Sequence, residues 1–247
     1  MNPRSIRLAV RQRYAQRAQG ASCCGGDKPA RVVASYNPHE VQKVPAEVLA
    51  AAAGCGNPTA IGALHPGEVV LDLGSGGGID CFLAAFQVGR AGRVIGVDMT
   101  PEMVALAERN RKRLALAQVA FVQGVLEALP LASASVDVII SNCVINLCPD
   151  KGAVFREMAR VLRPGGRAYI SDMVAWQALP EAVRHDLASW SACIAGAEPA
   201  ERYLALMEEA GLRVHRAEPK GTAAAECTGE EGSPVFSLEV EARKERP

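Results

Sequence analysis

The residues of this chain that could do the most chemistry are its cysteines. There are eight of them, at positions 23, 24, 55, 81, 143, 148, 193 and 227. Thiolate is the soft ligand that proteins offer to soft ions, and it is also the nucleophile of thiol–disulfide exchange. The N-terminus lacks the apolar segment of a secretory signal, so we expect a reducing, cytoplasmic location. There, cysteines indicate soft-ion binding, catalysis or simple burial in place of a disulfide framework.

A second chemical feature is the glycine-rich stretch from Val69 to Gly78, VVLDLGSGGG. An apolar run followed by glycines predicts a strand, a tight turn and a helix whose first N–H groups are free to bind a ligand. Asp98 ends the next apolar run, where a carboxylate can bind both hydroxyls of a ribose. Together these features predict a nucleotide-like ligand.

The glycine spacing indicates which nucleotide. Gly74, Gly76, Gly77 and Gly78 do not follow the Gly-x-Gly-x-x-Gly pattern of a dinucleotide site, and Asp72 stands two residues before the first of them. A carboxylate there would repel a pyrophosphate but attract the sulfonium cation of S-adenosylmethionine. We therefore expect S-adenosylmethionine as the cofactor.

Alternating strands and helices would position these residues. Apolar runs predict strands at 69–73, 94–97, 119–122, 136–140 and 167–171, helices between them, and closing strands at 212–215 and 235–241. This order predicts an α/β fold with a mostly parallel sheet and an antiparallel edge strand. We expect a catalytic domain over 69–247 and an N-terminal cap over 1–68, made of a helix, a Cys-Gly loop and a connector.

The composition excludes several classes of function. The chain is 49% hydrophobic with a formal net charge of zero and 4% aromatic residues, so neither a basic face nor a base-stacking surface for nucleic acid is expected. No apolar stretch approaches the ~20 residues of a membrane span. The arginine-rich start resembles a transit peptide in composition, but Ile6, Val10 and Tyr14 at four-residue spacing favour a basic amphipathic helix.

The glycine-rich stretch resembles motif I of class I methyltransferases. Residues 96–99 (GVDM) and 123–127 (QGVLE) resemble motifs II and III, which adds Met99 and Leu126 to the expected cofactor site of Asp72, Gly74, Gly76 and Asp98. Many members of that family have an aspartate where this chain has Val125, so we expect backbone or apolar contacts to adenine there.

Three further segments resemble arsenite S-adenosylmethionine methyltransferases. They are DVIISNCVINLCPDK at 137–151, GVDMTPE at 96–102 and GCGNP at 54–58. The resemblance implies a Rossmann-like fold, a small arsenical substrate, and arsenic held by Cys143 and Cys193 with help from Cys55. It places a fourth thiol in the N-terminal cap, at Cys23 or Cys24. It also implies a thiol reductant, thioredoxin or glutathione, as co-substrate.

The proposed chemistry suits these residues. Trivalent arsenic is thiophilic, and bound to thiolates it keeps a lone pair that can accept a methyl group. Methylation leaves arsenic pentavalent, and a dithiol can return it to the trivalent state by forming a disulfide. Cys55 with Cys23 or Cys24 is the expected reducing pair.

The remaining residues are expected to have structural roles or none. Cys81 and Cys148 are expected to fill the core and Cys227 to have no role. Asn142 and Asn146 are expected to orient the loop around Cys143 by hydrogen bonds to the backbone, Asp172 to lie in a turn, and Tyr14 either to touch the cofactor or to pack in the cap. Two rival functions stay open: a methyltransferase for a small organic carbon, nitrogen or oxygen acceptor, and a non-catalytic metalloid-binding protein.

Overall fold

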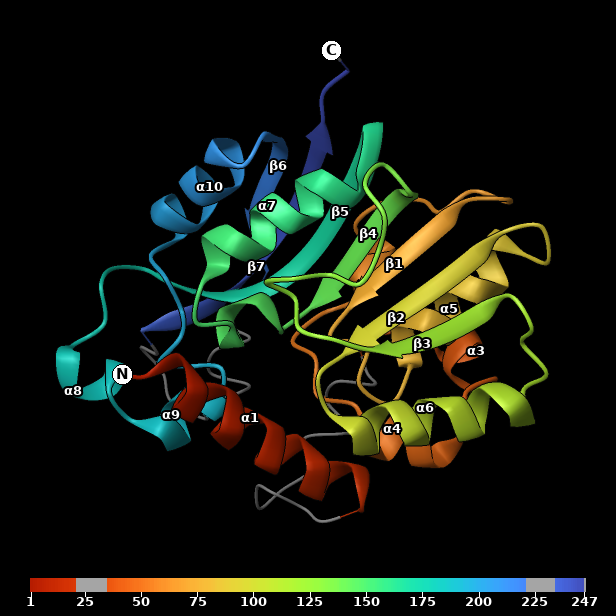
Figure 1. Ribbon diagram of the computed structural model, residues 1–247, viewed down its shortest axis with the longest axis horizontal. Helices are drawn as coiled ribbons and strands as arrows, with labels where there is room; N and C mark the ends of the chain where they lie inside the picture. The colour runs from red at the N-terminus through yellow and green to blue at the C-terminus, as the bar shows by residue number, and fades with distance from the viewer. Residues whose placement is uncertain (21–34, 221–233, 247) are drawn as a thin grey trace.

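A single seven-stranded sheet organises the chain (Figure 1), which is described by a computed structural model over residues 1–20, 35–220 and 234–246. The strands are β1 (Val69–Leu73), β2 (Arg93–Asp98), β3 (Val119–Gln123), β4 (Val136–Asn142), β5 (Leu162–Ala175), β6 (Leu212–Pro219) and β7 (Val235–Lys244). The helices are α1 (Pro3–Ala18), α3 (Pro38–Val41), α4 (Ala46–Ala51), α5 (Ile79–Val88), α6 (Pro101–Arg113), α7 (Lys151–Val161), α8 (Glu181–Arg184), α9 (Leu187–Ser191) and α10 (Ala200–Glu209), with 3-10 turns η1 (Pro58–Ala60) and η2 (Ile145–Leu147).

The sheet has the strand order β3-β2-β1-β4-β5-β7-β6. The first five strands in this order are parallel, whereas β7 runs antiparallel to both β5 and β6. The predicted mostly parallel sheet with an antiparallel pair at one edge is confirmed. Strand β7 lies between β5 and β6, and it pairs with β5 from Arg167 to Ala175.

Both faces of the sheet are buried, as expected for parallel strands. Leu71 and Leu73 of β1 pack on one face with residues of α7 and α10, and Val70 packs on the other face with residues of α5. The second face also receives Tyr36 and residues of α3 and α4, so part of the predicted cap belongs to the main core.

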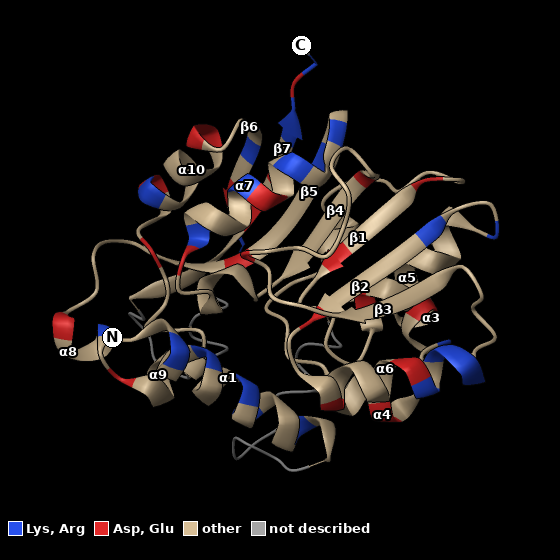
Figure 2. Ribbon diagram, viewed as in Figure 1, with Lys and Arg blue, Asp and Glu red and all other residues tan. Residues whose placement is uncertain are grey.

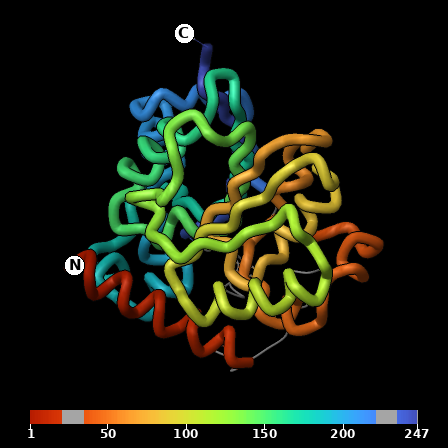
Figure 3. Tube along the Cα trace, turned by 45° about the vertical axis from the view of Figure 1, so that its right-hand side comes forward, coloured from red at the N-terminus to blue at the C-terminus, as the bar shows by residue number. Residues whose placement is uncertain are grey.

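Helix α1 lies across the carboxyl ends of the central strands, and the two views in Figure 1 and Figure 3 agree on this placement. Its N-cap is Asn2, whose side chain accepts a hydrogen bond from the N–H of Arg4 (2.9 Å). Ile6 and Val10 are buried against Leu147, while the arginines of the helix line its length (Figure 2). The sequence-based prediction of a basic amphipathic helix is therefore confirmed.

The sequence-based placement of Asp172 in a turn is wrong. Strand β5 continues through it to Ala175, and the side chain of Asp172 is fully buried. No helix in the described ranges is long and apolar enough to cross a membrane.

Candidate active site

A cavity of about 970 Å³, counting its solvent-filled mouth, lies between α1 and the carboxyl ends of the parallel strands. Five of the six residues predicted to bind the cofactor line it: Gly74, Gly76, Asp98, Met99 and Leu126. Of the predicted acceptor cysteines, Cys143 lines the same cavity, whereas Cys55 and Cys193 do not line it.

The turn after β1 is built from glycines for steric reasons. Gly74 has a φ of +66°, and a side chain on it would collide with Val144. Gly76, at a φ of +50°, donates its N–H to Asp98 (2.9 Å). Only glycine adopts such backbone angles without strain.

The side chain of Asp98, at the end of β2, is held by hydrogen bonds and can still accept more of them. One carboxylate oxygen accepts the N–H of Gly76 and the other that of Thr100 (2.8 Å), which leaves each oxygen free to accept a ribose hydroxyl. The nearby Ser75 hydroxyl is buried and has no hydrogen-bond partner among the described residues. This hydroxyl lies against Gly96 of β2, as does the buried Cys81 sulfur. The Asp98 carboxylate thus fits the ribose of S-adenosylmethionine.

Asp72 differs from its prediction. Its carboxylate is buried behind the turn, where it accepts a hydrogen bond from the Cys81 thiol (3.1 Å), and it does not line the cavity. Burial and the neighbouring Asp80 raise the pKa of Asp72 well above its usual range. Asp80, in the first turn of α5, lines the cavity instead, together with Asp98 and Glu127. Sequence reasoning missed Asp80 although it follows Gly78 by only two residues.

Asp80 belongs to a buried hydrogen-bond network. It accepts from the Tyr36 hydroxyl (2.9 Å) and from the Asn142 amide (3.4 Å). Burial raises the pKa of Asp80 to about 6, and the two hydrogen bonds oppose this shift. The carboxylate is therefore ionised at neutral pH and close to its titration range.

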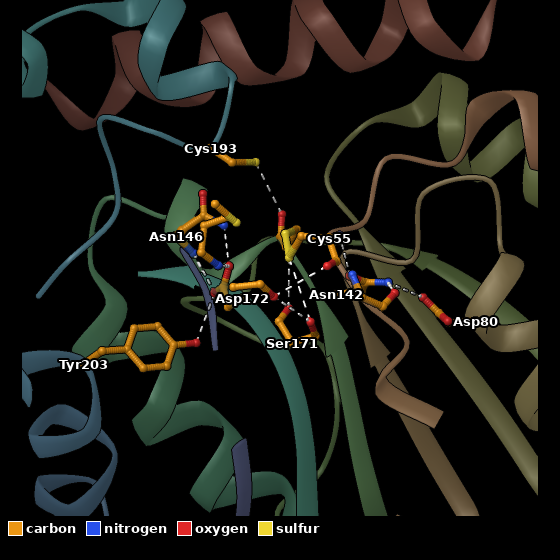
Figure 4. The surroundings of a disulfide bond; sticks show 12 residues. Cys55, Asp80, Asn142, Asn146, Ser171, Asp172, Cys193 and Tyr203 are labelled. Carbon is orange, nitrogen blue, oxygen red and sulfur yellow. Dashed lines mark hydrogen bonds between the residues drawn. A yellow bond between two sulfur atoms is a disulfide. The ribbon is translucent and has the colours of Figure 1, made fainter. Parts of the chain in front are cut away.

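Asn142, the last residue of β4, holds the GCG loop. Its side-chain oxygen accepts the N–H groups of Cys55 (3.0 Å) and Gly56 (3.3 Å), and its amide donates to the carbonyl of Gly56 (2.8 Å; Figure 4). Gly54 has no room for a side chain, because a Cβ there would collide with Asn142. Asn142 was expected to orient the loop around Cys143; its side chain instead holds the loop that carries Cys55.

Cys55 and Cys143 form a disulfide, with their Cα atoms 5.7 Å apart (Figure 4). The sequence-based prediction paired Cys55 with Cys23 or Cys24 instead. Cys23 and Cys24 lie outside the described residues, as does Cys227, so their expected roles stay predictions. A disulfide has no thiolate to offer, and no three His, Cys, Asp or Glu side chains in the described part of the chain are grouped to hold a metal ion.

Cys193 reaches the same place from the segment after α9. Its sulfur lies 3.8 Å from the carbonyl oxygen of Cys143 (Figure 4). Cys143 and Cys193 both adopt left-handed backbone angles, with φ of 53° and 66°. Such angles are uncommon for residues with a side chain and are often found at functional sites. The structure thus brings together the three predicted acceptor cysteines.

Tyr14 of α1 completes this side of the cavity. It lines the cavity and packs beside Met99 and Cys193. Burial, followed by the proximity of Cys193, raises the pKa of the Tyr14 phenol well above its usual value. Tyr14 is therefore placed both to pack in the cap and to meet a bound ligand.

Asp172 fixes the loop that follows Cys143, a role that sequence reasoning missed. Its carboxylate accepts the N–H of Asn146 (2.9 Å), the Asn146 side-chain amide and the hydroxyl of Tyr203 (3.0 Å). The predicted orienting role of Asn146 thus operates through Asp172. Cys81 and Cys148 are buried, as expected, although Cys148 also lines the cavity.

The comparisons with known proteins agree with this site. Residues 64–211 match a methyltransferase domain family. An arsenite methyltransferase of Halobacterium salinarum is 42% identical over 265 residues, which cover 98% of this chain and 68% of that protein. The chain belongs to the arsenite methyltransferase family. It is thus an S-adenosylmethionine-dependent methyltransferase, which confirms the expected fold, cofactor and class of enzyme.

Two further relatives place the chain within this family. An arsenite methyltransferase of Aquipseudomonas alcaligenes is 45% identical over 64% of this chain, which spans 47% of that protein. The crystal structure of an arsenic (III) S-adenosylmethionine methyltransferase from Chlamydomonas reinhardtii has a TM-score of 0.65 and 33% identity, and it covers 90% of this chain and 75% of its own. The chain thus spans about half of the Aquipseudomonas relative.

Proposed function

We propose that this enzyme transfers methyl groups from S-adenosylmethionine to trivalent arsenic held by the thiolates of Cys55, Cys143 and Cys193. One observation carries the proposal: three cysteines from distant parts of the chain converge beside the cavity that fits the methyl donor. A methyltransferase for an ordinary organic acceptor has no need of such a convergence.

The cofactor site follows from the geometry of the cavity. Gly74 and Gly76 allow close approach of a ligand to the backbone, and Asp98 offers its carboxylate to the ribose hydroxyls. We assign the ionised Asp80 to the cationic part of the cofactor. When bound, S-adenosylmethionine supplies an electrophilic methyl group. The residues around it position the reactants and exclude water, a contribution worth up to ~7–11 kcal/mol.

The described disulfide is the oxidised form of the acceptor site. Reduction of the Cys55–Cys143 bond frees two thiols, and Cys193 adds a third beside Cys143. Thiolates suit a soft, trivalent arsenic atom, and three of them leave its lone pair unshared. No general base is needed, because that lone pair carries no proton.

The redox balance of the reaction explains why two cysteines form a disulfide here. Arsenic gives both electrons of its lone pair to the new carbon bond and becomes formally pentavalent. Two thiolate ligands can return two electrons by leaving arsenic as a disulfide, which restores its trivalent state. Cys55 and Cys143 are placed to form that disulfide. A thiol reductant, which we assign to thioredoxin or glutathione of the cytoplasm, must then reduce it.

The test is turnover of labelled S-adenosylmethionine with arsenite and a thiol reductant. We expect methylated arsenic from the wild-type enzyme, a loss of about 100-fold or more in Cys143→Ser, and unchanged cofactor binding in that variant. Cys227→Ser, at the cysteine predicted to have no role, serves as the control. Full activity of Cys143→Ser would overturn the proposal, and label transferred to a carbon, nitrogen or oxygen acceptor would favour the rival enzyme.

A further inference from the structure

Three neighbouring strands make contacts that hold the loop that carries Cys55. Asn142 at the end of β4 binds its backbone N–H, Ser171 of β5 lies with its hydroxyl 3.9 Å from the Cys55 sulfur, and Ser237 of β7 donates to the Cys55 carbonyl (3.5 Å). Because β4, β5 and β7 are adjacent in the sheet, these contacts form one continuous floor beneath the disulfide.

Ser171 contacts both partners of the disulfide. Its carbonyl oxygen accepts the N–H of Cys143 (2.8 Å) and lies 3.7 Å from the sulfur of Cys55. Its hydroxyl fills the space that a side chain at position 56 would need, against Gly56. Replacing Ser171 by alanine removes the hydroxyl and leaves this carbonyl in place. Ser171 and Ser237 are both fully buried, so water cannot replace their hydrogen bonds. In Figure 4 the side chain of Ser171 lies directly below the sulfur of Cys55.

The hydrogens of the two serines can be assigned by counting donors. The sulfur of a disulfide has no hydrogen, so in the Cys55–Ser171 pair only the Ser171 hydroxyl can donate. Either hydroxyl can donate in the Ser171–Ser237 pair, 3.3 Å apart; when Ser237 gives its hydrogen to the carbonyl of Cys55, it is an acceptor toward Ser171. The hydrogen of Ser171 can therefore point either to Ser237 or to the sulfur of Cys55.

We propose that Ser171 is a positioning residue that turns its hydroxyl hydrogen from Ser237 to Cys55 when the disulfide opens and Cys55 becomes a thiolate. This inference rests on the proposed function for its purpose, but the effect on Cys55 does not require arsenic. A buried hydrogen bond to a thiolate favours the charged form and lowers the thiol pKa.

The same hydrogen bond directs the reduction of the disulfide. An incoming thiolate of a dithiol reductant forms a bond to the sulfur of Cys143, the bond to Cys55 breaks, and its electron pair leaves on Cys55. The second thiol of the reductant then displaces the first from Cys143. A thiol of low pKa leaves faster, and a stabilised reduced form makes the disulfide easier to reduce. Ser171 thus promotes recovery of the enzyme between turnovers.

The inference is tested on Ser171→Ala with Ser141→Ala as the matched control. Ser141 is equally buried, at the neighbouring end of β4, and its hydroxyl has no hydrogen-bond partner among the described residues. The readouts are the pH dependence of Cys55 alkylation in the reduced protein, measured on the Cys55 peptide, and the potential of the Cys55–Cys143 disulfide in a dithiol buffer. Neither readout needs arsenite, so failure of the proposed function would not affect them.

We expect Ser171→Ala to raise the Cys55 thiol pKa by about one unit and to slow alkylation below that pKa ~10-fold. At a pH above the Cys55 pKa, where the reduced form is the thiolate, the same tenfold change makes the disulfide about 30 mV harder to reduce. Ser141→Ala should leave both values at those of the wild type. Unchanged alkylation and potential in Ser171→Ala would overturn the inference.

Ser237→Ala provides a second test with the opposite sign, which also serves if Ser171→Ala does not fold. Loss of Ser237 removes the competing acceptor, so the hydrogen of Ser171 is committed to Cys55. The Cys55 pKa should then stay the same or fall. A rise in that pKa in Ser237→Ala would show that general loosening of the floor, and not the Ser171 hydrogen bond, controls the thiol, and it would overturn the inference.

Discussion

The sulfur of Cys193 lies 3.8 Å from the carbonyl oxygen of Cys143, across 50 residues of sequence, and both residues have left-handed backbone angles. Such angles cost a residue with a Cβ roughly 1–2 kcal/mol. The chain accepts this cost at two cysteines that are in contact, the sulfur of Cys193 with the backbone carbonyl of Cys143. We interpret the strain as the consequence of aiming both sulfurs at one substrate atom.

Because of this strain, replacing Cys193 by glycine should cost less stability than replacing it by alanine, which is the reverse of the usual order. We expect Cys193→Gly to be about 1 kcal/mol more stable to unfolding than Cys193→Ala, because glycine adopts a φ of 66° freely. Both variants should lose arsenite methylation. Cys148, with an ordinary φ of −76°, is the control: there glycine should be less stable than alanine. Denaturant unfolding of the four variants measures the effect, and equal stabilities of the two Cys193 variants would refute the strain.

A second prediction concerns the bond between Asn142 and the Cys55 loop. Asn142→Ala leaves the N–H groups of Cys55 and Gly56 without their acceptor and should destabilise the fold by about 1–3 kcal/mol. A freer loop should also lower the tendency of Cys55 and Cys143 to form their disulfide about 10-fold, as measured in glutathione redox buffers.

Asn110→Ala is the control for Asn142→Ala. Asn110 is a buried asparagine of α6 that bonds only the carbonyl of Leu106 among the contacts described for it. Its loss should destabilise the protein without changing the redox equilibrium of the disulfide. If both variants shifted that equilibrium equally, the assigned role of Asn142 would be lost.

The raised pKa of Asp80 should make cofactor binding and folding stability depend on pH in opposite directions. Its pKa in the fold is raised to about 6, above that of the unfolded chain. Above about pH 6 the carboxylate is charged and attracts a cation, so S-adenosylmethionine should bind more weakly as pH falls toward about 5. Calorimetric binding to wild type and Asp80→Asn measures this, and the variant should bind weakly with little pH dependence.

Stability should respond to Asp80 in the other direction. Between about pH 4 and pH 6 the folded chain holds the Asp80 proton while the unfolded chain has released it, so this group destabilises the fold as pH rises through that range. The difference in unfolding free energy between Asp80→Asn and wild type should therefore increase toward neutral pH. A constant difference over this range would contradict the raised pKa.

Local patterns in the sequence predicted much of this structure. Gly74, Gly76 and Asp98 were found because a strand, a tight turn and the next strand end follow one another closely, and their chemistry depends on neighbouring residues. The predicted strands likewise follow from short apolar runs. The acceptor cysteines were found by resemblance of the segments around them.

The remaining features depend on long-range contacts. Nothing local states that Asn142 meets the loop of Cys55, 87 positions away, and cysteine pairing cannot be deduced from sequence alone. Asp172 was missed because its buried partners, Asn146 and Tyr203, come from other elements. Asp80 lines the cavity where Asp72 was predicted, and this depends on how the turn packs behind β1.

X-ray absorption at the arsenic edge of the reduced, arsenite-loaded protein counts the sulfur ligands of arsenic directly. We expect three sulfur neighbours in the wild type and two in Cys193→Ser, while Cys81→Ser keeps three. Arsenic surrounded by oxygen, or a sulfur count that does not change when Cys193 is replaced, would contradict the assignment of these cysteines as the substrate site.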